Sequence, residues 1–305
     1  MDLGQLKKMI EGKVLDNELM SKHTSYGIGG PALAFVEPKS IKDLQMIKSF
    51  ALRNEIKIYC IGSGSNLLVS DAGINGLVIN LEKYFKKILF NNNKCYAETG
   101  VKLSKLVKES IKHGLGGMET MIGIPGTLGG ALVMNAGAYN QEISKCLTAV
   151  EIFNGKDIVE RISSNDINFG YRTSSFKSTD IIIGAEFVLN PMDIEEIEKN
   201  RDIANNQRKS TQPLKFRSAG SVFKNPKQGQ PAGYLIDQAG LKGKSIGGAK
   251  VSDIHANFIV NDTDATAEDM VKLIKHIRKT IMEKHSIFLE LEIKTLGFAE
   301  GTFDA

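Results

Sequence analysis

Arg172, Ser221 and Glu292 are polar residues whose types and settings could support chemistry on a charged substrate. Arg172 follows Tyr171 directly after a Phe-Gly pair, and its planar guanidinium could hold a carboxylate through two parallel hydrogen bonds. A surface ion pair is the commoner arrangement for such an arginine. The residue by itself therefore leaves both interpretations open.

Ser221 lies in the fragment Ala219-Gly220-Ser221, where its hydroxyl could donate a proton. A serine after glycine is more often a turn residue, and no G-x-S-x-G sequence surrounds it, so no nucleophilic triad is indicated. Glu292 alternates with apolar residues in the same register as Glu290, which is also typical of a solvated strand face. Both residues stay candidates on this evidence.

No metal site is predicted. The sequence contains no H-E-x-x-H, no carboxylate triad and no Cys/His cluster, and His255 in the fragment DIHAN is more typical of a structural histidine. Cys60, Cys95 and Cys146 form no C-x-x-C pair, and their odd number does not fit a disulfide framework. Cys60 lies in the apolar run IKIYCIG, where we expect a buried thiol.

Glycine clusters occur at 27–30, 62–64 and 123–130. A dinucleotide-binding G-x-G-x-x-G is not indicated, because Leu67 stands in the place of the third glycine, and no G-K-[ST] follows any cluster. Three ordinary turns would explain the clusters. Backbone N–H groups of such loops can also converge on phosphate oxygens, so an anionic dinucleotide is the alternative.

The elements that would position these residues alternate between helix and strand. Helical spacing predicts helices over 41–51 with Ser40 as N-cap, 103–112 ending at Gly114, 193–209, and 267–284 with Thr266 as N-cap. Strands are predicted over 56–61, 67–69, 77–81, 148–153, 181–189 and 287–294. The alternation indicates an α/β or α+β protein.

Length and composition fit an ordinary globular enzyme. A chain of 305 residues exceeds the usual size of a single core, so two or three lobes are expected. The formal net charge of +4 suits anionic ligands and is too small and too scattered for nucleic acid. No apolar run approaches the length of a membrane span, and the N-terminus lacks the apolar core of a signal peptide, so we expect a cytoplasmic protein without a membrane partner.

Taken together and in order, the motifs resemble the UDP-N-acetylenolpyruvoylglucosamine reductase (UDP-N-acetylmuramate dehydrogenase) family. The matching stretches are HTSYGIGG (23–30), IGSGSNLLVSD (61–71), GIPGTLGGALVMNAGAY (123–139), GYRTSSFK (170–177), AGSVFKNP (219–226), AGYLIDQAGLKGKSIGGAKVSDIHANFIVN (232–261) and LELEIKTLG (289–297). They cover nearly the whole chain, and the ordered set is far more specific than any single motif.

The resemblance implies an α+β fold with a PCMH-type two-lobed FAD-binding region and a C-terminal α/β lobe for the substrate. The implied division is a first FAD-binding lobe at 1–80, completed by 293–305, a second lobe at 81–209, and a substrate-binding domain at 210–292. It also implies the shorter subclass, which lacks an inserted tyrosine-bearing loop. The close spacing of Arg172 and Ser221 agrees with that subclass.

The resemblance also implies the site. Arg172, Ser221 and Glu292 match the family's catalytic residues. The residues expected to bind FAD are Thr24, Gly29, Gly62, Ser63, Gly64, Ser65, Asn66, Leu67, Gly123, Ile124, Gly126, Thr127, Gly130, Asn135, Ala136 and Gly137. The residues expected to contact the substrate are Tyr171, Lys209, Asn225 and Asn257.

The implied reaction is the NADPH-dependent, FAD-mediated reduction of UDP-N-acetylglucosamine enolpyruvate to UDP-N-acetylmuramate, a step of peptidoglycan precursor synthesis. FAD is expected to be bound non-covalently. Arg172 would stabilise the negative charge that builds on the substrate. Glu292 would hydrogen-bond to the enolate with a raised pKa, and Ser221 would deliver the proton.

Three positions depart from the family pattern, and two other functions stay open. Gly27 stands where members often carry a basic residue, Asn140 where glycine is common, and Lys294 where arginine is frequent. A PCMH-type oxidase is one alternative, although such enzymes often attach flavin through His or Cys, and the glycine loops contain neither. The other is a catalytically silent nucleotide-binding protein, which loss of Arg172, Ser221 or Glu292 would have favoured.

Overall fold

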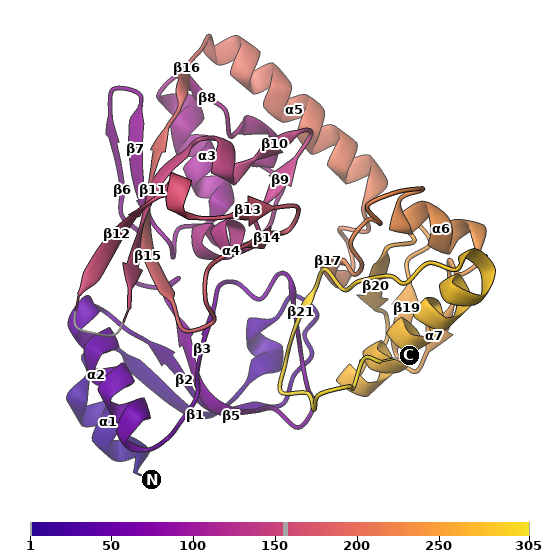
Figure 1. The fold of residues 1–305 in the computed structure, drawn as a ribbon, viewed down its shortest axis with the longest axis horizontal. Coiled ribbons are helices and arrows are strands. Elements are labelled where there is room, and N and C mark those ends of the chain that lie inside the picture. Colours follow the sequence, from indigo (N-terminus) through magenta and orange to yellow (C-terminus); the bar gives the residue numbers. More distant parts are fainter. Residues whose placement is uncertain (1, 155–157, 305) are drawn as a thin grey trace. The chain divides into compact units, whose positions relative to one another are not determined.

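A computed structural model describes residues 2–154 and 158–304 (Figure 1). The chain forms two compact units, which are described separately. Unit 1 consists of the residues up to Asp16, Leu33–Ser63 and Gly76–Arg208, and unit 2 of Asn17–Ala32, Gly64–Asn75 and the residues from Lys209 onward. Among the described residues, none of the helices combines the length and apolar character needed to cross a bilayer.

The first sheet lies mostly in unit 1 and has the order β1-β2-β5-β3. Its strands are β1 (Lys13–Leu19), β2 (Pro31–Glu37), β5 (Ile74–Asn80) and β3 (Ile58–Ile61), and its helices are α1 (Leu3–Met9) and α2 (Ile41–Arg53). β3 pairs with β5 in parallel. The hydroxyl of Ser40 caps α2 by accepting a hydrogen bond from the N–H of Asp43 at 3.2 Å, which confirms the predicted start of this helix. Leu44, Ile47 and Phe50 on its inner face are buried.

The second sheet of unit 1 is antiparallel throughout and has the order β12-β11-β15-β7-β6. Its strands are β12 (Val159–Ser163), β11 (Leu147–Phe153), β15 (Ile181–Val188), β7 (Lys94–Glu98) and β6 (Ile88–Asn91). α3 (Leu103–Lys112) and α4 (Leu128–Val133) contribute Leu106 and Leu132 to its core. α3 has the predicted bounds and is followed by Gly114 with φ +66°, a conformation that glycine adopts at little cost.

Short pairs of strands complete unit 1. They are β9 (Gly137–Ala138) with β10 (Gln141–Glu142), β13 (Phe169–Gly170) with β14 (Thr173–Ser174), and β8 (Leu115–Gly116) with β16 (Asn190–Pro191). Single turns of 3-10 helix lie at η2 (Glu119–Met121), η3 (Ile143–Lys145) and η4 (Ser164–Asp166). The polar helix α5 (Ile194–Thr211) buries few of its side chains, Ile197 and Ala204, and leads from unit 1 into unit 2.

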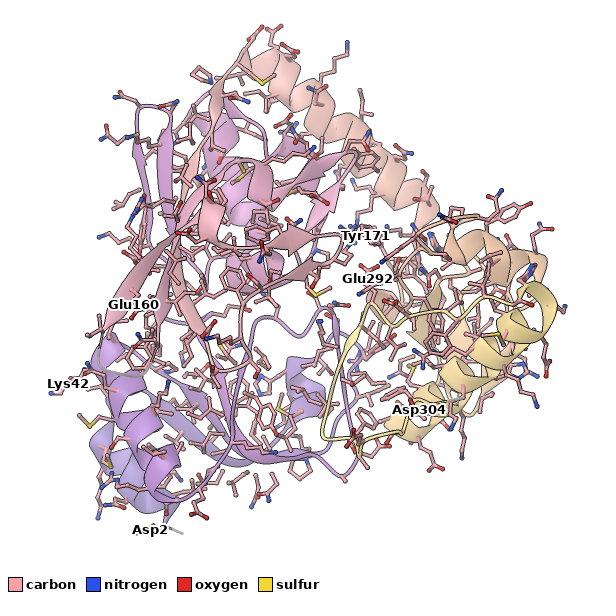
Figure 2. All side chains as sticks on the ribbon, in the orientation of Figure 1. Asp2, Lys42, Glu160, Tyr171, Glu292 and Asp304 are labelled. Atoms are coloured by element: carbon pink, nitrogen blue, oxygen red, sulfur yellow. The ribbon has the colours of Figure 1, made fainter. Side chains whose placement is uncertain are left out.

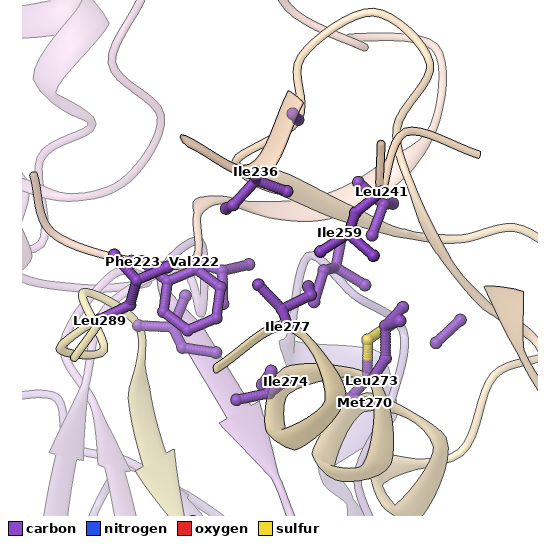
Figure 3. Packing of buried hydrophobic residues seen from close by; sticks show 14 of the residues in the cluster. Val222, Phe223, Ile236, Leu241, Ile259, Met270, Leu273, Ile274, Ile277 and Leu289 are labelled. Carbon is purple, nitrogen blue, oxygen red and sulfur yellow. The ribbon is translucent and has the colours of Figure 1, made fainter. Parts of the chain in front are cut away.

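Unit 2 is built around one sheet and the long helix α7 (Figure 1). The antiparallel sheet has the order β17-β20-β19-β18, and a parallel pair joins β21 to β4. The elements are η1 (Met20–His23), β4 (Leu67–Val69), β17 (Arg217–Ser221), α6 (Ala232–Gln238), β18 (Ser245–Ile246), β19 (Ala249–Val251), β20 (Phe258–Asn261), α7 (Ala267–His285) and β21 (Lys294–Leu296). Figure 3 shows side chains of α7 packed against apolar residues that include Val222, Phe223 and Ile259.

Two expectations about local structure are wrong. The strand predicted over 287–294 is mostly irregular, with a single bridge from Leu291 to Phe223, and regular pairing begins at Lys294. The alternation of apolar and polar residues in this segment reflects which side chains are buried, and not pairing with a neighbouring strand. Leu289 and Ile293 are buried, while Glu290 is exposed. Cys60 is exposed instead of buried, since β3 is the edge strand of the first sheet.

The expected α+β class is confirmed by the separate antiparallel sheets and helices. Three hydrophobic clusters stabilise them, two in unit 1 and one in unit 2.

Candidate active site

The predicted site residues are divided between the two units. Unit 1 carries Gly62, Ser63, the candidates from Gly123 to Gly137, Tyr171 and Arg172. Unit 2 carries Thr24, Gly29, Gly64 to Leu67, Lys209, Ser221, Asn225, Asn257 and Glu292. The boundary falls inside the motif GSGSN, between Ser63 and Gly64.

Asn80, at the end of β5, binds the backbone at Gly62, the first residue of the GSGSN motif. Its Nδ2 donates to the carbonyls of Gly62 at 2.8 Å and Ile61 at 3.3 Å, while its Oδ1 accepts from the N–H of Glu82 at 2.9 Å. The side chain is only 8% exposed. Because these carbonyls are already bonded, the loop has a fixed course before any ligand arrives. Sequence reasoning missed Asn80, since nothing near it in the sequence marks it.

A charged network surrounds Ser63 in the same motif. The hydroxyl of Ser63 donates to Glu82 at 2.8 Å and accepts from Nζ of Lys102 at 2.9 Å. Lys102 also pairs with Glu82 at 2.6 Å, and its backbone forms a bridge with Thr127 of the third glycine cluster. Lys102 and Glu82 therefore belong to the candidate site, although no motif in the sequence indicated them.

Thr127 connects two glycine clusters within unit 1. It is the N-cap of α4, where its Oγ1 accepts from the N–H of Gly130 at 3.4 Å. A Cβ at Gly62 would lie 2.4 Å from that same oxygen, so glycine is required where the two loops meet. At Gly130 a Cβ would meet only Thr127 Oγ1, at 3.8 Å, so this stretch of backbone is open to a bound group. Close loops with accessible backbone fit a flavin dinucleotide.

Arg172 lies at the turn of the β13-β14 hairpin with φ +55°, next to the Gly170–Thr173 pair. Its Nη2 donates to the carbonyl of Gly137 at 3.0 Å, and its Cζ lies 5.1 Å from the centroid of the Tyr171 ring. The structure thus brings the predicted catalytic arginine against the end of the predicted flavin stretch, as a cation stacked on an aromatic face.

Asn135 anchors the same hairpin from the glycine-rich stretch. Its Nδ2 donates to the carbonyl of Gly170 and to the carboxylate of Glu142, each at 3.1 Å, and its Oδ1 accepts from the N–H of Ser144 at 3.3 Å. Asn135 is buried and has φ +42°. These bonds favour a positioning role for its side chain over direct contact with FAD.

In unit 2 the first two glycine motifs lie against each other. The N–H of Ser25 donates to the carbonyl of Gly64 at 3.0 Å, and a Cβ at Gly64, where φ is +64°, would lie 2.0 Å from the carbonyl oxygen of His23. Thr24 closes its own loop, because its Oγ1 donates to the carbonyl of Ile28 at 2.8 Å. Gly29 has φ +136°. Glycine is therefore needed at 64 for both its conformation and the close approach.

Arg217 occupies the space beside Gly27, the position where a basic residue is expected from the resemblance. A Cβ at Gly27 would lie 2.4 Å from Nη1 of Arg217 and 3.2 Å from its Cζ. A guanidinium from β17 thus lies against the 24–30 loop although residue 27 has no side chain. This arginine was not among the predicted site residues.

Backbone hydrogen bonds within unit 2 join Glu292 to Val222, the residue after Ser221. Gly220, with φ +79°, turns the chain before Ser221 at the end of β17. The N–H of Glu292 donates to the carbonyl of Val222 at 2.8 Å, and Asn66 Nδ2 donates to the carbonyl of Glu292 at 3.1 Å. The backbone of Glu292 is therefore bound both by the residue that follows Ser221 and by Asn66 of the GSGSN motif.

The predicted substrate residues of unit 2 have different surroundings. Asn257 is 4% exposed and pairs with both backbone groups of Phe223, accepting at 3.0 Å and donating at 2.8 Å. The Asn257 side chain therefore binds the backbone two residues after Ser221. Asn225 is exposed, and its Oδ1 accepts from the N–H of Ala232 at the start of α6 at 3.1 Å, while Lys209 is exposed.

Two further features of the described residues bear on ligands. No group of three His, Cys, Asp or Glu side chains among them is placed to hold a metal ion. The Oε1 of Gln212 is buried and accepts no hydrogen bond from the described part of the chain. A buried acceptor of this kind calls for a donor from water or a ligand.

Comparison with known proteins gives the family. A model of the FAD binding domain matches residues 32–163, and a model of the UDP-N-acetylenolpyruvoylglucosamine reductase C-terminal domain matches residues 212–296. A relative from Carboxydothermus hydrogenoformans named UDP-N-acetylenolpyruvoylglucosamine reductase is 42% identical over 294 residues, which is 96% of this chain and 97% of the relative. The chain belongs to the UDP-N-acetylenolpyruvoylglucosamine reductase family.

Other members of the reductase family agree. A reductase of the same name from Caldanaerobacter subterraneus is 41% identical over 96% of this chain and 97% of its own. The crystal structure of UDP-N-acetylenolpyruvylglucosamine reductase (MurB) from Thermus caldophilus matches with a TM-score of 0.81 and 34% identity, covering 94% of this chain and 100% of that one. The expected fold, an FAD-binding region followed by the C-terminal domain of this reductase family, is confirmed, and the oxidase alternative is set aside.

Proposed function

We propose that this protein reduces the enolpyruvyl group of UDP-N-acetylglucosamine enolpyruvate to give UDP-N-acetylmuramate, with NADPH as electron donor. The proposal is supported by two reductases of that name that are 42% and 41% identical to this protein over 96% of its chain. The product is a precursor of peptidoglycan, so the enzyme serves cell-wall synthesis. The catalytically silent alternative is disfavoured, because Arg172, Ser221 and Glu292 are all present.

FAD would be held, without a covalent bond, by backbone groups of the glycine motifs. The close contact of Gly62 with Thr127, the open backbone at Gly130 and the Gly64 carbonyl bonded to Ser25 support this assignment. When bound, FAD supplies the hydride that it receives from NADPH. The protein's part is to fix the loops, and Asn80 and Lys102 contribute to that in unit 1.

Arg172 would bind the substrate's carboxylate. Addition of a hydride to the terminal enolpyruvyl carbon places negative charge on the neighbouring carbon and its carboxylate. A guanidinium that is already oriented by Gly137 and the Tyr171 ring can stabilise that charge without reorganising, which lowers the barrier.

Ser221 would deliver the proton that completes the reduction. Its hydroxyl gives the proton to the carbanion carbon and regains one from water, so a hydride and a proton together saturate the double bond. Glu292 would hydrogen-bond to the enolate from the segment beside the serine strand. The backbone bond between Glu292 and Val222 supports this pairing of roles.

The remaining parts of the proposal follow the same resemblance. FAD would be bound by lobes at 1–80, completed by 293–305, and at 81–209, and the substrate by a domain at 210–292. Tyr171, Lys209, Asn225 and Asn257 would contact the substrate. We place the enzyme in the cytoplasm, where NADPH is available, with no membrane or nucleic-acid partner.

An absorption spectrum of the purified protein tests the proposal. A flavin spectrum should bleach when NADPH is added without oxygen, and it should recover when UDP-N-acetylglucosamine enolpyruvate is added. UDP-N-acetylglucosamine serves as the matched control, because it lacks the enolpyruvyl group and should leave the flavin reduced. If the flavin spectrum recovered with neither of these two UDP-sugars, the proposed function would be refuted.

A further inference from the structure

Arg278 is a buried arginine on α7 that no sequence motif indicated. Its side chain is 6% exposed, and burial lowers the pKa of its guanidinium from the ordinary value. Burial of a guanidinium destabilises the folded protein unless its N–H groups are hydrogen-bonded. The groups that Arg278 binds therefore indicate its role.

Those partners lie on both sides of Glu292 in the C-terminal segment. Nε of Arg278 donates to the carbonyl of Leu289 at 2.9 Å, Nη1 donates to the carbonyl of Phe303, and Cζ lies 4.6 Å from the centroid of the Phe288 ring. One side chain therefore ties both ends of the segment that carries Glu292 to α7. Figure 2 labels Glu292 and Asp304 on this segment.

The segment needs such a clamp because it has little regular structure. Residues 286–290 form no strand, and Leu291 makes a single bridge to Phe223. Next to this bridge, the N–H of Lys224 donates to the carbonyl of Glu290 at 2.9 Å, and the backbone of Glu292 is bound by Val222 and Asn66. A small movement of Leu289 would be passed to Glu292 three positions along an extended chain.

We propose that Arg278 is a positioning residue for Glu292. It binds the carbonyls on either side of the segment and so fixes where the carboxyl group of Glu292 is presented. This inference rests on the proposed function, in which Glu292 acts on the substrate and not in the reaction of NADPH with flavin.

The test measures the two half-reactions in Arg278→Met and Arg278→Lys. Arg278→Met should slow reoxidation of the reduced flavin by UDP-N-acetylglucosamine enolpyruvate by about tenfold or more, because small displacements of catalytic groups are expensive. Reduction of the flavin by NADPH should stay within about twofold. Arg278→Lys keeps the positive charge but lacks the planar set of donors of a guanidinium. Its rate of flavin reoxidation should lie between those of the wild type and Arg278→Met.

Leu273→Ala is the matched control for loss of stability. Leu273 is a buried residue of the same helix, and in Figure 3 it lies beside Met270, whereas Leu289 lies beside Phe223. Leu273→Ala should lower the melting temperature and leave both half-reactions close to wild type. If Arg278→Met only matched this control, the arginine would be a structural residue and the inference would be overturned.

A double mutant separates a role through Glu292 from any other. In a Glu292→Gln background, which already slows reoxidation, Arg278→Met should add less than about a threefold further loss, since the two act on one group. Independent, multiplicative losses would overturn the inference. If Arg278→Met does not fold, Phe288→Leu, which removes the ring under the guanidinium, takes its place. Failure of the wild type to reoxidise with the substrate would refute the proposed function instead.

Discussion

At the scale of single residues, the described site depends on side chains that bind backbone carbonyls. Asn80 holds Gly62, Asn135 holds Gly170, Asn66 holds Glu292 and Asn257 holds Phe223. An amide can donate and accept at once, and Asn80, Asn135 and Asn257 do both. The role of such residues is evident from the structure but cannot be recognised in the sequence, because the bonded partner is far away along the chain.

Asn80→Ala should weaken FAD binding. The substitution leaves the carbonyls of Gly62 and Ile61 without their buried donor, at a cost of about 1–3 kcal/mol, or roughly five- to 150-fold in affinity if the loop relaxes in the free protein. Fluorescence titration of the apoprotein with FAD measures this. Asn91→Ala, at an exposed position of β6, is the control and should bind FAD like the wild type. Equal affinities for all three proteins would contradict the role of Asn80.

Gly64→Ala should lower thermal stability and FAD content far more than Gly229→Ala, a substitution with similar backbone strain. Both Gly64 and Gly229 have positive φ, which costs a residue with a Cβ about 1–2 kcal/mol. At Gly64 the new Cβ would also lie 2.0 Å from the backbone oxygen of His23, whereas at Gly229 nothing lies within 4 Å. Thermal unfolding and FAD content should therefore fall much more in Gly64→Ala than in Gly229→Ala. Similar losses in the two variants would count against close packing of the motifs.

At the scale of elements, local signals predict helices well and strands less well. α3 has the predicted bounds, and the Ser40 and Thr266 caps start α2 and α7, because capping and helical periodicity are properties of adjacent residues. The segment at 287–294 alternates like a strand, yet Arg278 and Val222 take its backbone groups. Whether a run of alternating residues pairs with a neighbour depends on what lies beside it in the fold.

The start of α7 gives a pH-dependent prediction. The pKa of Asp269 is held below its ordinary value, chiefly because the backbone N–H of Thr266 donates to its carboxylate, with the N–H of Gly248 as a second donor. A lowered folded-state pKa means that the stabilisation is present at neutral pH and is lost as the pH falls through that pKa.

Asp269→Ala should therefore destabilise the protein at neutral pH by about 1 kcal/mol, the usual cost of a lost cap. The difference from wild type should shrink as the pH is lowered below the ordinary range of an aspartate. Urea unfolding of both proteins across the acidic range measures it, and Glu300→Ala, at an exposed position, corrects for the loss of one surface charge. A difference that stayed constant with pH would contradict the ionised cap.

At the scale of the whole molecule, the candidate flavin residues come from both compact units, with the boundary inside GSGSN. The sequence indicates the family and hence the residue set, because the motifs are ordered along the chain. It does not indicate which of those residues have a positioning role, since Asn135 and Asn257 acquire theirs from partners in other elements. Fold class and chemistry are thus predictable, while the supporting contacts are not.

Removal of FAD should lower the stability of the folded protein. A ligand that binds only the folded state at a hundred times its dissociation constant adds about 2.7 kcal/mol. The melting temperature of the apoprotein should therefore rise as FAD is added and keep rising with the logarithm of its concentration. Riboflavin, which lacks the phosphates and the adenosine, should have a much smaller effect. Equal stabilisation by riboflavin would contradict a site built for the dinucleotide.

We expect Ser221 to act on the enolpyruvyl substrate and not in the reduction of the flavin by NADPH. The most direct measurement is stopped-flow absorbance of Ser221→Ala beside the wild type, with each half-reaction followed separately. NADPH should reduce the flavin of the variant at a rate close to wild type, while reoxidation by UDP-N-acetylglucosamine enolpyruvate should slow by at least about a hundredfold, as expected for loss of a general acid. Slowing of both half-reactions by the same factor, or of neither, would contradict it.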